Sequence, residues 1–237
     1  MHSLATNTLG KSKHFVLSVA LVLATLLIAA RAGNTQQLRQ GVSVNMAVTS
    51  SAAPMPEADN LDAWIVAVTP DGSVYFGVDL VTPSRLAEKM KSIPRRRDQK
   101  LYIKADARAP FADVRGVFTA AHDVGFDAAV LLTFQTESPT PGTVVPPKGL
   151  EVQIAPHSNA ATIVVQVNAG QPPTFLVNDQ ETPAAALQDT LRRLLQNRSD
   201  TPVLVKTHGP ASFAAVVQVI DACHSIGGKV MLSTPQL

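Results

Sequence analysis

The sequence has little of the material from which catalytic and metal centres are built. Its 237 residues include one cysteine, Cys223, which excludes an intrachain disulfide, and no cysteine lies near residue 30 to accept a lipid. The GxSxG, HExxH and CxxC motifs are all missing, and the carboxylates are not clustered. We therefore expect no catalytic, metal-binding or cofactor-binding residues, and a protein that is not an enzyme.

An excess of charge of one sign is also lacking. Lys and Arg number 20 against 18 Asp and Glu, a formal net charge of +2, so we expect no nucleic acid as a partner. One basic tip, Arg95-Arg96-Arg97, follows the first predicted helix, with Lys89, Lys91 and Lys100 nearby. A solvated loop is the default interpretation of this tip, and a contact with anionic lipid or a partner is the alternative.

Long apolar runs are limited to one, residues 15–30, which two lysines precede and Arg31 follows. As a helix this run spans about 24 Å, less than the roughly 30 Å of bilayer hydrocarbon. Extension through Gly33 closes the gap if Arg31 reaches toward the lipid headgroups. We predict a transmembrane signal-anchor helix at 14–33, with residues 1–13 in the cytoplasm and the rest outside. The alternative, a cleaved signal peptide with Ala30-Arg31-Ala32 as its processing site, stays open.

What the sequence does contain is an internal repeat. LYIKADARAPFADVRGVFTAAHDVGFDAAVLLT, at 101–133, is matched by VLVKTHGPASFAAVVQVIDACHSIGGKVMLST, at 203–234. Four pairs keep one constant spacing without a gap: Lys104 and Lys206, Phe111 and Phe213, His122 and His224, Gly125 and Gly227. Two copies are too few for a solenoid, so each copy is expected to be a small domain. We place the domains at 41–135 and 149–237, joined by a Pro-rich linker at 136–148.

Each copy predicts the same order of elements. In the first copy AWIVAV and VYFGV flank the turn TPDGS as a hairpin, and Thr82-Pro83-Ser84 opens a helix. LYIKAD is the next strand, the following helix ends at Gly125 as a left-handed cap, and AAVLLTF closes the sheet. The fold class is therefore α+β: an N-terminal transmembrane helix, then two tandem two-layer ββαβαβ domains with helices on one face of a mixed sheet.

Several residues allow both a functional and a structural interpretation. His122 and His224 recur at matching positions, but each lies in a last helical turn, where a partly positive imidazole suits the helix dipole better than a shared metal site. Asp106 is interpreted as a turn residue that bonds the following backbone rather than as a catalytic acid. Cys223 falls on an apolar helix face and is expected in the core.

The segments that open the two domains are candidate docking strands. GVSVN and GLEVQI alternate apolar and polar residues, which predicts strands only loosely committed to their own domain. Such a strand can leave a sheet edge free for a partner's strand, although an ordinary edge strand is the equal alternative. The inward-facing residues proposed to bind a partner are Val42, Val44, Met46, Leu150, Val152 and Ile154.

An apolar N-terminal segment followed by GVSVN, VTPDGSVYFG, LYIKAD and the helix ending in His-x-x-Gly resembles the ExbD/TolR family of biopolymer-transport proteins. The second copy fits less closely, since Thr207-His208 replaces Ala105-Asp106. The resemblance implies a single-pass protein of the bacterial inner membrane with its C-terminal domains in the periplasm. It also implies a multi-span ExbB/TolQ-like partner and a TonB- or TolA-like protein.

The sequence of the predicted membrane span differs from the family pattern. Family members carry an aspartate near the start of the span as the proton-binding group, whereas LSVALVL places Ser18 there, and no acidic residue precedes Glu57. Serine cannot carry a proton at physiological pH, and an intramembrane carboxylate would be a functional signal. We therefore expect a component of an energy-transducing envelope transport complex of the TonB/Tol type that acts by protein contact without its own proton-relay carboxylate. The alternative is a cleaved periplasmic module that binds a peptide or an envelope component.

The resemblance implies that two copies of the domain meet as in a homodimer, and here the second copy belongs to the same chain. Tethering two self-associating domains raises their effective concentration to about millimolar. We therefore predict that the two repeats pack against each other as an intramolecular pseudo-dimer.

Overall fold

The computed structural model describes residues 41–135, 145–155, 163–196 and 200–233. The chain divides into two units, Met1–Gln37 and Leu38–Leu237, and every described residue belongs to the second. The predicted transmembrane helix at 14–33, with Ser18, lies outside the described residues. Within the described ranges, no helix combines the length and the apolar character that crossing a membrane requires.

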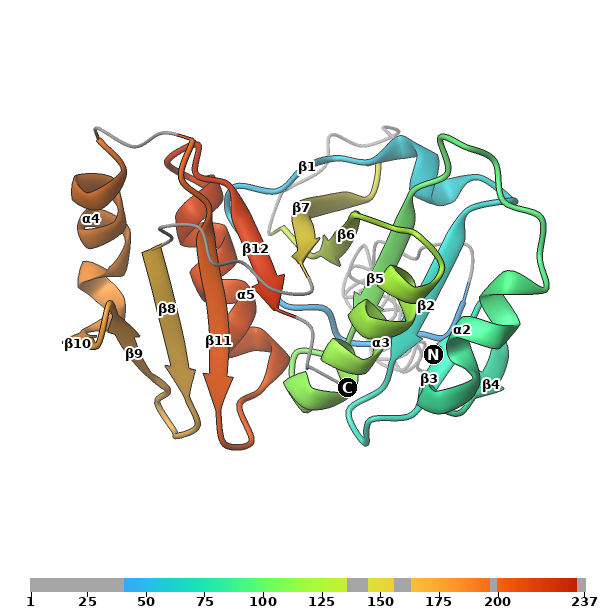
Figure 1. Cartoon of the computed structure of the whole chain (residues 1–237), viewed down its shortest axis with the longest axis horizontal. Helices are drawn as coiled ribbons and strands as arrows, with labels where there is room; N and C mark the ends of the chain where they lie inside the picture. The colour runs from blue at the N-terminus through green and yellow to red at the C-terminus, as the bar shows by residue number, and fades with distance from the viewer. Residues whose placement is uncertain (1–40, 136–144, 156–162, 197–199, 234–237) are drawn as a thin grey trace, which may run out of the picture. The chain divides into compact units, whose positions relative to one another are not determined.

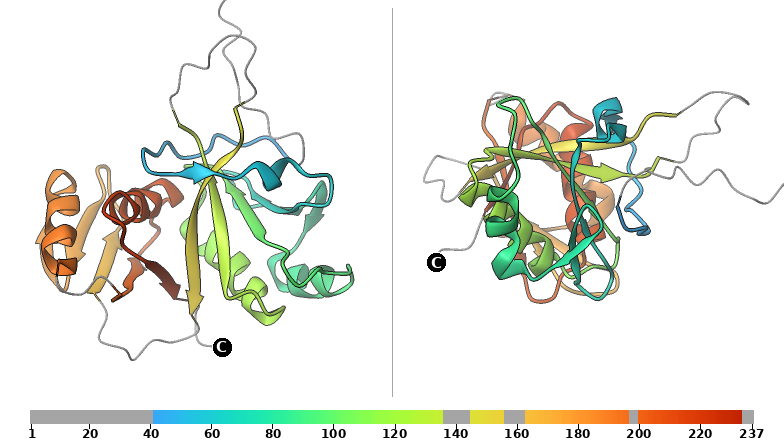
Figure 2. Two further views of the ribbon diagram at one scale, coloured as in Figure 1. Left: turned by 90° about the horizontal axis from the view of Figure 1, so that it is seen from above. Right: turned by 90° about the vertical axis from the view of Figure 1, so that its right-hand side faces the viewer.

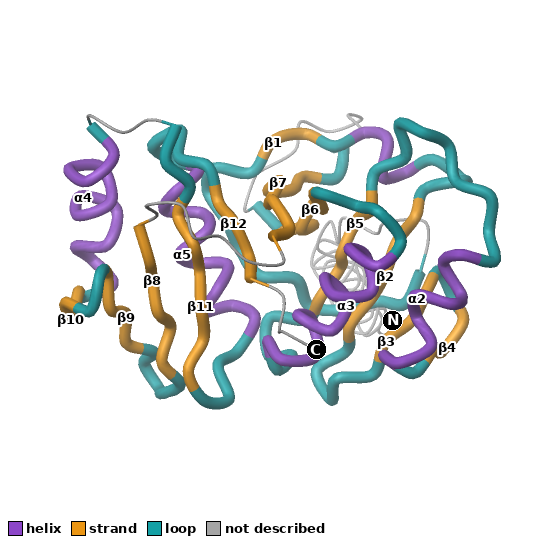
Figure 3. Tube along the Cα trace, viewed as in Figure 1, coloured by secondary structure: helices purple, strands orange, loops and turns teal. Residues whose placement is uncertain are grey.

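The first repeat follows the predicted order with one additional strand (Figures 1 and 3). Its elements are β2 (Trp64–Val68), β3 (Val74–Phe76), β4 (Asp79–Val81), α2 (Pro83–Lys91), β5 (Leu101–Ala105), α3 (Phe111–Asp123) and β6 (Ala128–Thr133). The return strand predicted at VYFGV ends at Phe76 as β3, and β4 follows it as a strand that was not predicted. The chain reverses at Gly77, whose φ of 64° is easily adopted only by a residue without a Cβ atom.

The second repeat has the same elements, preceded by one more strand, β7. They are β7 (Lys148–Ala155), β8 (Ile163–Asn168), β9 (Thr174–Val177), β10 (Gln180–Thr182), α4 (Ala184–Leu195), β11 (Val203–His208), α5 (Phe213–His224) and β12 (Val230–Ser233). Here the hairpin reverses at Asn178 and Asp179, both with positive φ. Asparagine and aspartate tolerate this region better than other residues with side chains, which explains why no glycine is needed.

The strands of both repeats form one mixed sheet in the order β10-β9-β8-β11-β12-β7-β6-β5-β2-β3-β4 (Figure 2). The junction is β7, which pairs antiparallel with β6, from Ala128 opposite Gln153 to Thr133 opposite Lys148. On its other side β7 pairs parallel with β12. The repeats therefore pack against each other within the chain, as a pseudo-dimer requires.

The strand β7 corrects one expectation from the sequence. GLEVQI was predicted to be a loosely held edge strand, but β7 has neighbours on both sides. Besides β6 and β12, it pairs with β1 (Ala53–Pro54) near its start. Leu150 and Val152 are 1% exposed and Ile154 is 5% exposed. The reason is that the last strand of each repeat leaves an unpaired edge, and β7 satisfies the backbone groups of both edges at once.

The helices share one hydrophobic core on one face of this sheet. Buried side chains from both repeats belong to the same cluster, including Leu86 of α2, Phe118 of α3, Leu187 of α4 and Phe213 of α5. The starts of α3 and α5 are joined directly, because the backbone N–H of Phe213 donates to the carbonyl of Ala109 at 2.8 Å. The predicted placement of helices on one sheet face is thus confirmed for the described residues.

The opposite face differs between the repeats. In the first repeat Ile65, Tyr102, Val130 and Leu132 form a second buried cluster. It is covered by Met46, by Met55 and by the short 3-10 helix η1 (Pro56–Asp59). Two matched lysines show the consequence: Lys104 of the first repeat is 4% exposed, whereas Lys206 is exposed. The chain that leads into the first repeat therefore covers a surface that its counterpart leaves more open.

Candidate functional site at the lead segment

The lead segment, residues 41–55, is the candidate functional site because its hydrogen bonds reach both repeats. Its side chains alternate as predicted: Val42, Val44 and Met46 are half-buried, and Ser43 and Asn45 are exposed. Only its last part forms a ladder with the sheet, as β1 beside β7, and residues 41–52 do not. Isolated bridges join Met46 to Asp106 and Val48 to Phe134. Its attachment depends on these bridges and on three groups of hydrogen bonds.

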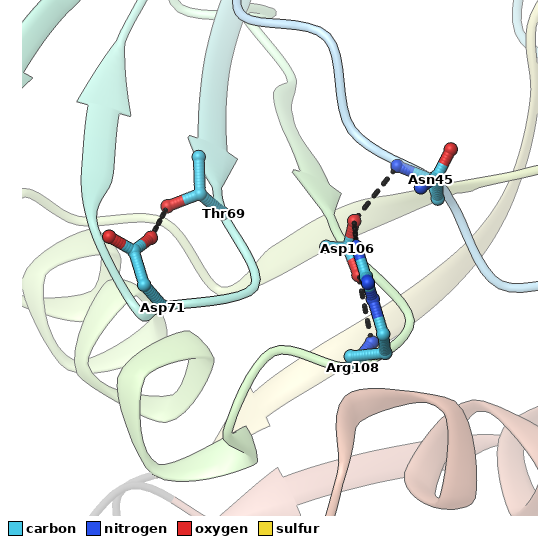
Figure 4. Close-up of polar contacts among 5 residues, drawn as sticks. All are labelled: Asn45, Thr69, Asp71, Asp106 and Arg108. Atoms are coloured by element: carbon cyan, nitrogen blue, oxygen red, sulfur yellow. Dashed lines mark hydrogen bonds and ion pairs between the residues drawn. The ribbon is translucent and has the colours of Figure 1, made fainter.

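The first attachment is Asp106, at the end of β5 (Figure 4). One of its carboxylate oxygens, Oδ2, accepts from the Asn45 backbone N–H at 3.0 Å. The other, Oδ1, accepts from the backbone N–H and the Nε of Arg108, both at 3.0 Å. The backbone of Ala107 adds a bond to the Asn45 carbonyl at 2.8 Å. Asp106 is therefore a turn residue that bonds the backbone two positions later, as predicted, and it also holds the lead segment.

The charge of Asp106 is secured by its surroundings. The residue is 1% exposed, and burial alone would raise its pKa. Hydrogen bonds from Arg108 and Asn45 outweigh burial, so the pKa lies below the ordinary value. Asp106 therefore stays ionised at neutral pH, and a carboxylate that is already fully bonded is poorly placed to act as a general acid.

A polar turn lies close to this attachment (Figure 4). The Thr69 hydroxyl donates to Asp71, which lowers the pKa of that carboxyl, and the Thr69 N–H donates to the carbonyl of Ser73 at 3.0 Å. Gly72 sits against Asp113, because a Cβ atom at Gly72 would lie 2.3 Å from the Asp113 carboxylate. These contacts fix the β2 to β3 turn that the TPDGS sequence predicts.

The second attachment lies at the end of β6. The backbone N–H of Phe134 donates to the Ala47 carbonyl, and the N–H of Thr49 donates to the Phe134 carbonyl, both at 2.9 Å. The hydroxyls of Thr49 and Thr133 are 2.7 Å apart in a buried contact. This attachment keeps the lead segment at the junction between the repeats.

The third attachment crosses to the second repeat. The Asp221 carboxylate of α5 accepts from the backbone N–H groups of Ser50, at 3.0 and 3.1 Å, and of Ser51, at 2.9 Å. The hydroxyls of both serines donate to the same carboxylate. Burial would raise the pKa of Asp221, but these serine bonds outweigh it and the pKa is lowered. An ionised carboxylate of the second repeat therefore holds the chain that enters the first.

Neither charged attachment is duplicated by the repeat. The alignment places His208 opposite Asp106, and Thr119 opposite Asp221. Sequence reasoning considered Asp106 but missed Asp221 and its serines. The signal that could have found Asp221 is a lone carboxylate within the otherwise mostly apolar helix VVQVIDAC. The two repeats thus have the same fold, but different residues hold the lead segment.

The matched histidines do not form a common site. His224 Nε2 lies 2.9 Å from the carbonyl of Glu151 in β7, and burial lowers the pKa of His224. A neutral His224 that donates to this carbonyl corrects the expected partly positive imidazole. His122 has its Nδ1 buried without a hydrogen-bond partner. In the described ranges no three His, Cys, Asp or Glu side chains gather closely enough to hold a metal ion.

The remaining candidates have structural surroundings. Cys223 is buried, which raises the pKa of its thiol to about 12. Arg95 of the basic tip donates to the carbonyls of Val124 at 3.2 Å and Gly125 at 3.3 Å, and it lies 4.3 Å from the centre of the Phe126 ring. Arg95 thereby stabilises the end of α3. Arg95 remains exposed, so this contact within the chain is compatible with a solvated tip.

Fold and site together define an α+β module whose two halves share one sheet and hold one lead segment. The sequence profile described as biopolymer transport protein ExbD/TolR matches the chain twice, at residues 17–136 and 129–236. No curated protein and no solved structure matches the chain. Because the two matches cover most of its length, the chain belongs to the ExbD/TolR family, and the double match agrees with a tandem duplication. This family consists of accessory proteins of energised biopolymer transport.

Proposed function

We propose that this chain is a membrane-anchored component of an energy-transducing envelope transport complex of the TonB/Tol type. Residues 14–33 would anchor it in the bacterial inner membrane as a single pass, with both repeats in the periplasm. Its partners would be an ExbB/TolQ-like multi-span protein and a TonB- or TolA-like protein. It would act by protein contact and not as an enzyme.

The observation that carries this proposal is the double attachment of the lead segment. Asp106 bonds Asn45 in the first repeat, and Asp221 of the second repeat bonds Ser50 and Ser51. A pull or rotation applied to residues that precede the lead segment would therefore act on both halves of the sheet. This arrangement suits transmission of motion from a membrane motor to periplasmic domains.

Partner capture would use the lead segment in part. Val42, Val44 and Met46 are half-buried, and a partner's strand would pair along 41–46 through the backbone groups that Asp106 and Ala107 do not already engage. Leu150, Val152 and Ile154 would serve the internal partner, since β7 lies between β6 and β12. Partner capture through β7 would require that strand to separate from one neighbour.

Proton coupling would run through the channel partner and not through this chain. The motivation is Ser18, which stands where the family carries its aspartate. We expect Ser18→Ala to leave any transport phenotype of the host intact, and Ser18→Asp to add a titratable group that can restore coupling. Complete loss of the phenotype in a normally expressed Ser18→Ala strain would contradict this part of the proposal.

Isolation of the full chain from host membranes tests the complex. An ExbB/TolQ-like multi-span protein should co-purify with the wild type and with Asp221→Ala, because the channel contact lies in the membrane segment. The TonB- or TolA-like protein should crosslink more weakly to Asp221→Ala. Recovery of the chain without any multi-span partner, in a mild detergent, would favour a freestanding periplasmic binding module instead.

A further inference from the structure

The two ends of the sheet differ in chemistry although they are built from equivalent hairpins. β4 forms the end in the first repeat and β10 the end in the second, at opposite ends of Figure 1. Hairpin register makes Leu80 equivalent to Glu181, since Tyr75 opposes Leu80 and Leu176 opposes Glu181. The β4 end therefore carries an apolar residue where the β10 end carries a carboxylate.

The side chains that differ between the two ends of the sheet are exposed to solvent. Leu80 is 67% exposed and Val78, in the turn before it, is 75% exposed. In the second repeat the corresponding Asp179 and Glu181 are exposed polar residues, and these are the charges that keep free edges from pairing. The β10 end thus carries charges at the two positions where the β4 end carries exposed apolar side chains.

The backbone of β4 is ready to accept another strand. Phe76 and Asp79 flank a two-residue turn and form the hydrogen-bonded pair, so the next pair, Tyr75 and Leu80, is not hydrogen-bonded across the hairpin. The N–H and C=O of Leu80 therefore point away from β3. Beside them, a groove of about 620 Å³ separates β4 from α2.

We propose that β4 is a self-association edge, and that its occupant is β4 of a second copy of this chain. An antiparallel pair centred on Leu80 has two-fold symmetry, because each Leu80 N–H donates to the Leu80 carbonyl of the other copy. The two leucines then lie side by side with the Tyr75 rings on the helix-free face. A closed dimer with two-fold symmetry results.

Charge supports this occupant over an unrelated strand. In the centred register Asp79 of one copy lies opposite Val81 of the other, on the face where α2 borders the groove. Arg85 and Lys89 of α2 line that groove, and Arg85 has a 75% exposed side chain held only by Glu88 at 3.6 Å. Asp79 is also paired with Lys89 of its own chain at 3.0 Å, and its exposed carboxylate would be shared between that lysine and Arg85 of the other copy.

The polar β10 end disfavours pairing between β4 of one molecule and β10 of the next. If β4 paired with β10 of the next molecule, the contact would repeat without closing and would build a filament. Glu181 and Asp179 oppose such a contact, because a charged edge disfavours burial beside an apolar strand. Pairing of β4 with β4 uses the same edge of each molecule and therefore stops at two copies.

Disulfide trapping of the full chain in membranes tests this proposal. Residues that face each other in a hydrogen-bonded antiparallel pair have Cα atoms about 5.5 Å apart, within the usual disulfide range. Cys223 is buried, so Leu80→Cys supplies the accessible thiol. We expect mild oxidation to shift Leu80→Cys from 25.1 kDa to twice that mass. The matched variant Glu181→Cys, equally accessible to a maleimide, should stay at 25.1 kDa.

A second variant separates register from random collision. Val78 is more exposed than Leu80, but the centred register places it opposite Thr82 and not opposite itself. Val78→Cys should therefore form less dimer than Leu80→Cys. Self-pairing through β4 would be overturned if Leu80→Cys and Glu181→Cys were trapped equally, or if Val78→Cys formed more dimer than Leu80→Cys. It would also be overturned if Leu80→Cys were trapped onto a protein of different mass.

Discussion

The bonds between Asp221 and the lead segment can be tested by removing the carboxylate. In Asp221→Ala the N–H groups of Ser50 and Ser51 lose the acceptor that now lies 2.9 to 3.1 Å away. A hydrogen bond to a charged group contributes about 1.5–3 kcal/mol. Because Asp221 is half-buried and several bonds share one carboxylate, we take about 2 kcal/mol for the whole attachment after screening by solvent.

Hydrogen exchange measures this loss directly. A change of about 2 kcal/mol in local opening corresponds to about 30-fold faster exchange of the Ser50 and Ser51 amides. The amides of β7, deeper in the sheet, should keep their protection. The matched control is Asp189→Ala, which removes an exposed carboxylate of α4 that bonds Arg192 of the same helix.

Two outcomes would refute this role of Asp221. If the Ser50 and Ser51 amides exchange at wild-type rates in Asp221→Ala, the carboxylate does not hold the lead segment. If Asp189→Ala accelerates them equally, the effect is a general loss of stability. A combined Ser50→Ala, Ser51→Ala variant should change little further when Asp221→Ala is added, because all three substitutions remove the same contact.

Three further results are expected. Gly149→Ala should lower the free energy of unfolding by about 1–3 kcal/mol, because its Cβ would lie 2.5 Å from Val130 and 3.0 Å from a backbone oxygen of β6. In the same denaturant melts the control Gly116→Ala, whose Cβ would lie 3.9 Å from its nearest neighbour, should be unchanged or slightly more stable. The folded pKa of Asp221 is lowered, so its contribution to stability should persist from pH 8 to pH 5 and decline below about pH 4. Denaturant melts of the wild type and of Asp221→Ala at each pH would measure this contribution as the difference in free energy of unfolding. Val44→Pro should fold, since residue 44 lies outside the sheet ladder, yet weaken crosslinking to an envelope partner; unchanged crosslinking would exclude this segment as the docking strand.

The sequence predicted the elements well because their signals are local. Alternating and continuous apolar runs mark β2, β5 and β6, Pro83 begins α2, and Gly125 ends α3 with a φ of 82°. The repeat added the second half at once, since one pattern of helices and strands had to serve both copies.

What the sequence could not predict depends on contacts between distant residues. GLEVQI has the same alternation whether it lies at an edge or between β6 and β12, so periodicity alone could not place it. Asp221 and Ser50 are 171 positions apart, and no local pattern links them. His224 resembled a helix cap until the Glu151 carbonyl, contributed by β7, appeared beside its ring.

The fate of residues 15–30 decides between an anchored transport component and a released periplasmic module. Mass spectrometry of the N-terminus of the chain isolated from its native host measures this directly. An anchored component requires that residues 15–30 are retained in the mature chain and that the chain fractionates with the inner membrane. A mature chain that starts at Gly33 and is recovered in the periplasm would contradict the proposed role.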